Sequence, residues 1–217
     1  MRFENRRQAG QELAERLLQW AGDGDLTDIV VLALPRGGVP VAAEIAKALH
    51  VPLDVVVARK IGVPGAPEVG IGAIVGEDPP VFDRLALQAL HLSEDRLGSD
   101  VARERLELHR REALYRSGSP PPRVAGRSVV LVDDGLATGG TARAALRHLR
   151  RQGPRQLVLA VPVGSPEAVR ALREEADDVI CVHLPERLSS VGEWYTDFAQ
   201  VPDDEVIRAL REVRSAV

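Results

Sequence analysis

Two adjacent carboxylates at the end of an apolar run are the clearest sign of chemistry in this sequence. The run Val129–Val132 is followed at once by Asp133 and Asp134, and small residues at 137–141 then lead into a predicted helix. Two carboxylates at a strand end can accept hydrogen bonds from vicinal hydroxyls, such as the 2- and 3-hydroxyls of a ribose. The backbone N–H groups of the small loop, the start of the helix and two threonine hydroxyls can hold a phosphate. The spacing therefore describes a site for ribose 5-phosphate.

The alternative interpretation of this run is an ordinary strand, turn and helix cap. Turns of Asp and Gly are common, but a double aspartate followed by Ala-Thr-Gly-Gly-Thr is much rarer. The run is not a Walker phosphate loop, because the Gly-Lys-Ser/Thr ending is missing. It is not a dinucleotide fingerprint either, because it lacks Gly-x-Gly-x-x-Gly. We therefore favour the ribose phosphate interpretation.

The run 129–141 resembles the phosphoribosyl pyrophosphate (PRPP) binding motif of type I phosphoribosyltransferases. That family moves ribose 5-phosphate from PRPP to a nitrogen nucleophile, usually a purine or pyrimidine base. The resemblance extends in looser form over about Ile29–Val182. It implies that Asp133 and Asp134 hold the ribose hydroxyls, directly or through a metal. It also implies that the 5-phosphate is held by Ala137, Thr138, Gly139, Gly140 and Thr141.

The resemblance assigns two further segments to pyrophosphate. The segment after the first predicted strand has the place of the family's pyrophosphate loop, which often contains a strained or cis peptide; it consists of Pro35, Arg36, Gly37 and Gly38. Arg59 and Lys60 end the second predicted strand, where related enzymes place a basic pair near pyrophosphate. Without the resemblance, the first segment is a tight turn and the second is a pair of solvated cations.

A segment rich in glycine and proline, Ile61–Gly70, follows the basic pair and is predicted to be a loop. In the family, a mobile lid that excludes water from the reacting sugar has this position.

The PRPP-like run 129–141 departs from the family pattern at two positions. Gly135 replaces a bulky aliphatic residue, and Ala137 stands where hypoxanthine/guanine-type members carry an acid that works on the purine. The second departure argues mildly against a 6-oxopurine acceptor.

The family's base-binding hood is built from terminal segments, and the candidate here is Pro185–Pro202, with the N-terminal helix as a second candidate. Aromatic rings in this segment could stack on a flat base, and acids could accept hydrogen bonds from its N–H groups. These residues are Trp194, Tyr195 and Phe198 with Glu193 and Asp197. The alternative is that the rings anchor a small satellite core. His183 lies near a strand end and could also face the site.

Short apolar runs alternate with amphipathic segments along most of the chain, which predicts an α/β fold. We expect a parallel sheet flanked by helices on both faces, with ligands bound outside the carboxyl ends of its strands. A single domain would span 1–217, with a core of about 29–183 and a hood of about 184–202. The predicted strands are 29–34, 53–58, 71–75, 128–132, 157–161 and 179–182. The predicted helices are 6–21 (ended by a turn at 22–25), 39–50, 83–91, 93–117, 140–152, 166–175 and 203–214.

The composition is that of an ordinary globular protein. The 217 residues are 45% hydrophobic and 28% charged, unlike a disordered or collagen-like chain. A single cysteine, Cys181, excludes a disulfide framework and a cysteine-rich metal cluster. The longest aliphatic stretch, 29–34, is far shorter than the ~20 residues of a membrane span, and residues 1–11 contain no apolar secretion signal. We therefore expect a cytoplasmic protein with no membrane partner.

We expect a Mg²⁺-dependent phosphoribosyltransferase that uses PRPP and a small nitrogenous base, and the resemblance suggests a homodimer. Mg²⁺ would bridge PRPP oxygens, with Asp133 and Asp134 as its protein ligands, and would keep several waters. Pyrophosphate leaves as the sugar C1 develops positive charge. The negative charge of the departing pyrophosphate would be stabilised by Arg36, Arg59 and Lys60 with the backbone amides of Gly37 and Gly38.

The alternative function is a PRPP-sensing regulator of the same fold that binds RNA or DNA. The segment Arg103–Arg123 carries six arginines against three glutamates and would be the contact surface. The same pattern is typical of a solvated helix face laced with ion pairs four residues apart. A net charge of −4 provides no global attraction for nucleic acid, so the enzyme is the favoured hypothesis.

Overall fold

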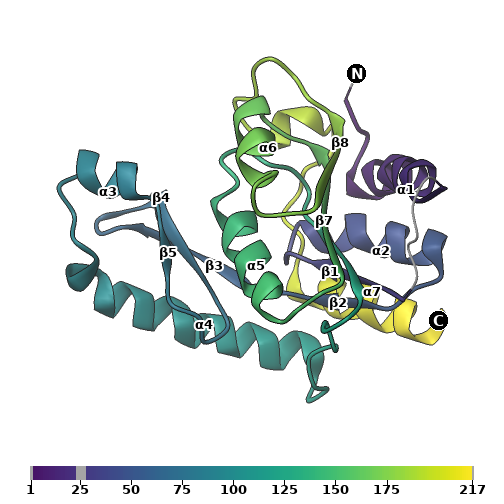
Figure 1. The fold of residues 1–217 in the computed structure, drawn as a ribbon, viewed down its shortest axis with the longest axis horizontal. Helices are drawn as coiled ribbons and strands as arrows, with labels where there is room; N and C mark the ends of the chain where they lie inside the picture. The colour runs from purple at the N-terminus through teal and green to yellow at the C-terminus, as the bar shows by residue number, and fades with distance from the viewer. Residues whose placement is uncertain (1, 23–27, 217) are drawn as a thin grey trace.

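The main sheet of the protein has five parallel strands in the order β2-β1-β6-β7-β8 (Figure 1). A computed structural model describes residues 2–22 and 28–216, so residues 23–25 of the turn predicted at 22–25 lie outside the described residues. The strands are β1 (Ile29–Ala33), β2 (Leu53–Val55), β6 (Ser128–Val132), β7 (Gln156–Val163) and β8 (Asp178–His183). The central strands β1 and β6 are buried along their whole length, as continuous aliphatic runs require.

Helices cover both faces of this sheet, as predicted. One face is covered by α1 (Arg6–Gly22), α2 (Gly38–Leu49) and α7 (Asp203–Ala216), and the other by α5 (Gly140–Arg151) and α6 (Pro166–Leu172). Side chains alternate along each strand, so Val130 and Val132 enter the first core while Val129 and Leu131 enter the second. Within residues 2–22 and 28–216, no helix is long and apolar enough to cross a membrane.

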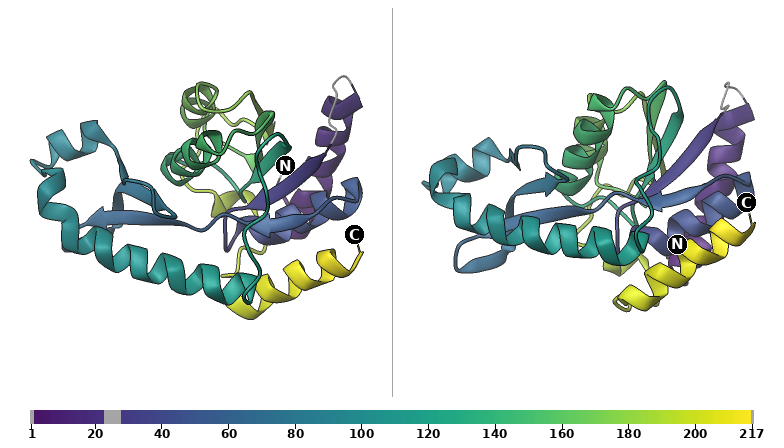
Figure 2. Two further views of the ribbon diagram at one scale, coloured as in Figure 1. Left: turned by 60° about the horizontal axis from the view of Figure 1, so that its bottom comes forward. Right: turned by 90° about the horizontal axis from the view of Figure 1, so that it is seen from below.

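A second unit, residues 58–116, projects from the main sheet, and we call it the arm (Figures 1 and 2). It contains a three-stranded antiparallel sheet in the order β3-β4-β5 and the helices that follow it. Its elements are β3 (Ala58–Val63), β4 (Ala66–Val75), β5 (Val81–Phe82), α3 (Arg84–Ala89), the 3₁₀ turn η1 (Glu94–Leu97) and α4 (Gly98–Arg116). The helix predicted over 93–117 therefore begins with a 3₁₀ turn.

The loop predicted at Ile61–Gly70 is wrong, because β3 and β4 form a hairpin through most of it. The strand predicted over 53–58 is also interrupted, since β2 ends at Val55 and β3 begins at Ala58. Proline has no N–H to donate to a neighbouring strand. Pro67 is tolerated in β4 because β5 is two residues long and pairs with Gly72 and Ala73, so β5 does not reach Pro67. A Cβ on Gly62 would lie 2.3 Å from the Pro67 carbonyl oxygen, so this glycine allows close strand contact rather than a loop.

The N-terminal segment meets the segment before α7 beside the main sheet. Phe3 forms a parallel bridge with Tyr195, and the Phe3 N–H donates to the Trp194 carbonyl at 2.8 Å. A short 3₁₀ turn, η2 (Gly192–Trp194), precedes this contact. Phe3, Ala9, Val163 and Tyr195 form a small buried core with Trp194 and Phe198 packed on it, and we call this set the terminal cluster.

Candidate active site

The double aspartate and the segment 35–38 lie side by side at the carboxyl edge of the main sheet. They follow β6 and β1, which are neighbours, and the Leu34 N–H donates to the Val132 carbonyl at 2.9 Å. Glycine is required at this approach, because a Cβ on Gly37 would lie 2.0 Å from Asp134 Oδ2. A Cβ on Gly38 would lie 2.7 Å from the Val132 carbonyl oxygen. The structure therefore brings the two predicted segments into direct contact.

Arg36 is held by the C-terminal helix. The Pro35–Arg36 peptide bond is cis, which confirms the conformation expected at this place. Arg36 Nη1 lies 3.8 Å from Asp203 Oδ1, in the first turn of α7. The same oxygen accepts a hydrogen bond from the Tyr115 hydroxyl at 2.6 Å. Asp203 thus ties the loop after β1 to α7 and to the end of α4.

The two aspartates form a tight, largely desolvated acidic pair. Burial, and next the charge of Asp134, raise the pKa of Asp133 well above its ordinary value. Burial also raises the pKa of Asp134, and the hydrogen bond and charge of Arg6 oppose that rise. Asp133 Oδ1 accepts the Asp134 N–H at 2.9 Å. Hydrogen-bond donors or a cation from a ligand would therefore stabilise the ionised form of the two carboxylates.

Arg6 is a site residue that sequence reasoning missed. Its Nε donates to Asp134 Oδ2 at 2.8 Å, and its Nη1 donates to the Ala199 carbonyl at 2.8 Å. The guanidinium carbon lies 3.8 Å from the centre of the Phe198 ring. The side chain is only 11% exposed. The contact spans 128 residues, and no local pattern distinguishes Arg6 from the chain's other arginines, so no sequence signal could have found it.

The predicted phosphate loop forms one wall of a cavity of about 420 Å³. Gly139 precedes α5 with a φ of 75°, and no side chain caps this helix start. The Ser165 hydroxyl donates to the Ala137 carbonyl at 2.8 Å and holds the loop from behind. The other wall belongs to the arm. The lining residues are Lys60, Glu68, Val69, Gly70, Gly72, Val81, Phe82 and Asp83 from the arm, and Thr138, Gly140, Thr141 and Arg143 from the loop and α5.

The basic pair of β3 is divided by the alternation of the strand. Lys60 lines the cavity, and its Nζ donates to the Glu68 carbonyl oxygen. Arg59 instead forms an ion pair with Glu104 of α4, with an Nη2–Oε2 distance of 2.6 Å. Successive residues of a strand point to opposite faces, so Arg59 and Lys60 lie on different faces of β3. Of the predicted pair, only Lys60 lines the cavity with the phosphate loop.

The aromatic residues of the predicted hood pack mainly on one another. Tyr195 is buried, stacks on Phe198 with a centroid separation of 5.0 Å, and donates its hydroxyl to the Asp134 carbonyl at 2.6 Å. Trp194 is half-buried against the His183 ring, 5.5 Å away between centroids. Base stacking by these rings stays a prediction, and Tyr195 connects the N-terminal segment to Asp134 in either case.

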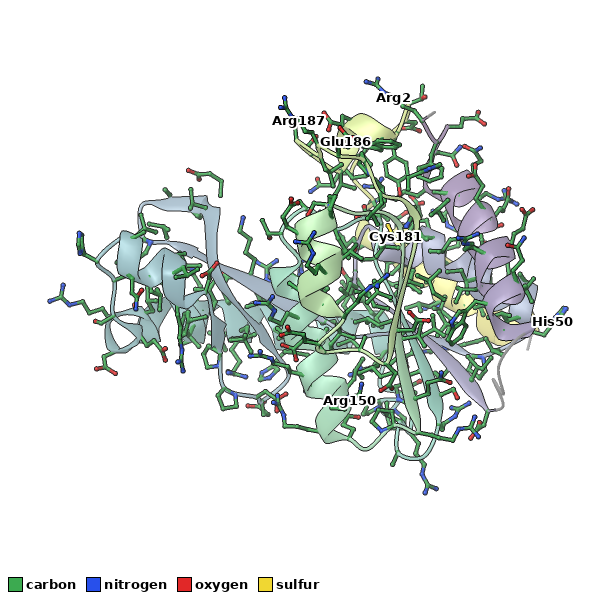
Figure 3. All side chains as sticks on the ribbon, turned by 45° about the horizontal axis from the view of Figure 1, so that its top comes forward. Arg2, His50, Arg150, Cys181, Glu186 and Arg187 are labelled. Carbon is green, nitrogen blue, oxygen red and sulfur yellow. The ribbon has the colours of Figure 1, made fainter. Side chains whose placement is uncertain are left out.

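Glu193 and Asp197, the two hood acids expected to bind a base, have different surroundings. The Glu193 carboxylate accepts the Ser189 N–H at 2.9 Å and so closes its own loop. Asp197 is exposed and lines a second cavity, of about 250 Å³, to which Asn5 and Arg6 also contribute. In the segment after β8, Glu186 and Arg187 are exposed at the surface (Figure 3). Of Glu193 and Asp197, Asp197 is therefore the acid that stays open to a ligand.

The arginine-rich segment on α4 is largely paired within the protein. Arg110 and Arg111 both bind Glu107, and the hydrogen bond from Arg110 is the main cause that lowers the pKa of Glu107 to about 2. Arg116 donates to the Val55 carbonyl at 3.0 Å. Arg105 donates to carbonyl oxygens of the turn between β4 and β5. The Glu107 pairs are those expected of a helix face laced with ion pairs, whereas Arg105 and Arg116 bind backbone carbonyls of other elements, and a nucleic-acid role for this face stays a prediction.

Fold and motif together define a type I phosphoribosyltransferase domain, in which a parallel sheet carries a double aspartate and a phosphate loop at its carboxyl edge. The chain belongs to the phosphoribosyl transferase family, because the model of the phosphoribosyl transferase domain matches residues 4–205.

Relatives and solved structures agree with this membership. The Mycobacterium tuberculosis (strain H37Rv) protein Rv0571c, provisionally named a phosphoribosyl transferase, is 42% identical over 208 residues, which are 96% of this chain and 46% of the relative. The chain thus spans about half the length of the curated relatives it matches. A uracil phosphoribosyltransferase of Lactobacillus gasseri is 42% identical over 59 residues, 27% of this chain and 28% of that protein. The crystal structure of TT1426 from Thermus thermophilus is 44% identical with a TM-score of 0.80 and covers 98% of this chain and 99% of its own.

A more distant structure shares the fold alone. AQ2163 from Aquifex aeolicus is 14% identical, with a TM-score of 0.53 over 94% of this chain and 86% of its own.

Proposed function

We propose that the protein transfers ribose 5-phosphate from PRPP to a nitrogenous base and releases pyrophosphate. The observation that carries the proposal is the contact between the double aspartate and the cis-peptide loop, beside the phosphate loop that follows β6. One ligand that presents vicinal hydroxyls, a phosphate and a pyrophosphate would satisfy all three groups. PRPP is the ligand with that chemistry.

Each group has a distinct task in this proposal. The carboxylates of Asp133 and Asp134 accept the ribose hydroxyls, and the backbone N–H groups of 137–141 hold the 5-phosphate together with the threonine hydroxyls. The loop 35–38 offers its amides and the Arg36 guanidinium to the pyrophosphate. Arg59 joins them only if it leaves Glu104.

The acidic pair fits a magnesium ion. Among the described residues, no group of three or more His, Cys, Asp or Glu side chains converges on one point. Two carboxylates at most would therefore come from the protein, which suits an ion that takes its remaining ligands from phosphates and water. The raised pKa values of Asp133 and Asp134 show a desolvated pair that a cation would stabilise in the ionised form. Bound there, magnesium would neutralise charge on the pyrophosphate.

The protein's own contribution is mainly position and exclusion of water. The sugar C1 gains positive charge as its bond to pyrophosphate breaks, and the base nitrogen then forms the new bond to C1. Holding both ends of PRPP fixes C1 against the acceptor, which is the larger part of such catalysis. The hairpin β3–β4 forms one wall of the cavity beside the phosphate loop, so its closer approach would exclude water from the reacting sugar.

The acceptor is proposed to bind beside the terminal cluster, between residues 184–202 and the start of α1. Ala137 leaves no acid at the position that 6-oxopurine enzymes use, and several relatives of this chain are named uracil phosphoribosyltransferases. Uracil is therefore the first base to test. In this proposal residues 1–217 form a single domain with a core of about 29–183 that includes the arm, and the protein acts as a homodimer in the cytoplasm.

The test is PRPP binding by a variant that keeps the fold. Asp133→Asn combined with Asp134→Asn keeps the shape of both side chains and removes both charges. We expect calorimetry with Mg²⁺ to show PRPP binding by the wild type and a loss of at least about 100-fold in the variant. Asp204→Asn, on the exposed side of α7, is the matched control and should bind as the wild type does. Unchanged affinity in a folded double variant contradicts the site.

A further inference from the structure

Arg143 differs from the other arginines of its helix in having a buried, unsatisfied donor. Among the described residues, its Nε is buried without a hydrogen-bond partner. Its one ion pair is long, with Nε 3.9 Å from Glu175 Oε1. That oxygen already accepts two hydrogen bonds from Arg147, at 2.6 and 2.9 Å. A donor left this way costs free energy unless a ligand supplies the acceptor.

Arg143 also lies at the wall of the phosphate cavity, and its side chain is 38% exposed although Nε is buried. Arg143 lines the cavity together with Thr138, Gly140 and Thr141, and it lies in the first turn of α5. Side chains of a helix lean toward its N-terminus, so an arginine here leans toward the loop that precedes the helix. Lys60 of the arm lines the same cavity. Two cations, one from the arm and one from α5, thus line the cavity together with the phosphate loop.

We propose that Arg143 binds the phosphate monoester of the sugar substrate and gives the site its selectivity for the doubly charged phosphate. This inference deepens the proposed function and rests on its placement of the ribose phosphate. The loop amides and hydroxyls are neutral donors that hold any oxyanion, whereas a guanidinium adds a full charge and paired N–H groups. No part of the double-aspartate motif includes this residue, which lies two positions beyond Thr141.

The experiment measures ribose 5-phosphate binding to the full chain by calorimetry, without any transfer reaction. Arg143→Gln should weaken binding about 10- to 100-fold and flatten its dependence on salt, because one charged contact is lost. Arg143→Lys should recover part of the affinity. Arg150→Gln is the matched control, since Arg150 lies near the opposite end of α5 and pairs with Asp177 (Figure 3). It should bind within about twofold of the wild type.

The outcomes separate this inference from the proposed function. Arg143→Gln could weaken ribose 5-phosphate binding while the wild type releases no pyrophosphate with any base. That result would support the role of Arg143 and contradict the proposed transferase activity. Equal losses in Arg143→Gln and Arg150→Gln overturn the inference. So does a wild type that fails to bind ribose 5-phosphate, or an Arg143→Gln chain that binds it normally. Urea unfolding of each variant confirms that the fold survives, and Arg143→Lys keeps the test valid if the glutamine variant unfolds.

Discussion

Replacing Arg6 with alanine is expected to destabilise the fold and to disturb Asp134 at the same time. Arg6 and Asp134 are 11% and 15% exposed, so the variant leaves a largely buried carboxylate without its cation. Removing one partner of a buried ion pair costs roughly 3–5 kcal/mol. Residual exposure and proton uptake by the carboxylate reduce the loss, while the contact with the Phe198 ring adds to it. We expect a loss of about 2–4 kcal/mol in the free energy of unfolding at neutral pH.

The pH dependence of this loss follows from the pKa of Asp134. Burial raises that pKa and Arg6 opposes the rise, so the variant's folded-state pKa is higher still. A carboxyl whose pKa is higher in the folded state binds more protons folded than unfolded, and stability then falls as the pH rises. The deficit against the wild type should therefore be smallest near about pH 5 and grow toward about pH 8.

The assay is urea unfolding of both proteins in a chelating buffer across this pH range. Arg7→Ala is the control, because the neighbouring Arg7 side chain is 73% exposed and pairs with Glu44 at 3.4 Å. Its effect should stay within about 0.5 kcal/mol at every pH. A deficit for Arg6→Ala that equals this control, or that stays constant with pH, would refute the reasoning.

Three further substitutions probe other parts of the site. Gly37→Ala places a Cβ 2.0 Å from Asp134 Oδ2, so calorimetry should show PRPP affinity lowered at least about tenfold, and unchanged affinity would contradict the geometry. Lys60→Ala should lower the turnover rate about 100-fold while nucleoside monophosphate binding changes little, and equal losses would make it an ordinary binding charge. Tyr195→Phe removes a 2.6 Å hydrogen bond to the Asp134 carbonyl and should lower the free energy of unfolding by about 1–2 kcal/mol, so a thermal midpoint within error of the wild type would argue against that bond.

Continuous aliphatic runs made the main sheet predictable. The strands predicted at 29–34 and 128–132 match β1 and β6 closely, because a strand buried on both faces needs apolar residues at every position. Because these two strands are neighbours, the polar segments that follow them had to meet. The contact between the double aspartate and residues 35–38 therefore follows from the position of β1 beside β6 in the sheet.

The arm could not be predicted from the same signals. Glycine and proline in 61–70 are typical of a loop, yet here they allow two strands to pack closely and leave Pro67 without a second neighbour that needs its N–H. Because β3 was not predicted over these residues, the separation of the Arg59 and Lys60 side chains was not predicted either. Two cations at the end of a strand were expected to act together, whereas within β3 they lie on opposite faces.

Long-range contacts account for the remaining differences. Arg6 and Asp203 reach the site through tertiary packing, and their local sequence resembles that of any charged helix. Tyr195 was expected near the site for its ring, but the structure gives it a buried position and a hydroxyl contact to the Asp134 backbone. Periodicity assigns residues to helices, and it does not say which distant carboxylate a helix end will meet.

The most direct test of the enzyme is release of pyrophosphate from PRPP in the presence of Mg²⁺, measured with uracil first and then with other pyrimidine and purine bases. The account predicts release that requires one base and disappears in the folded Asp133→Asn, Asp134→Asn variant. Absence of release with every base, from protein that still binds PRPP, would contradict transfer to a base. Release that persists in the double variant would contradict the site.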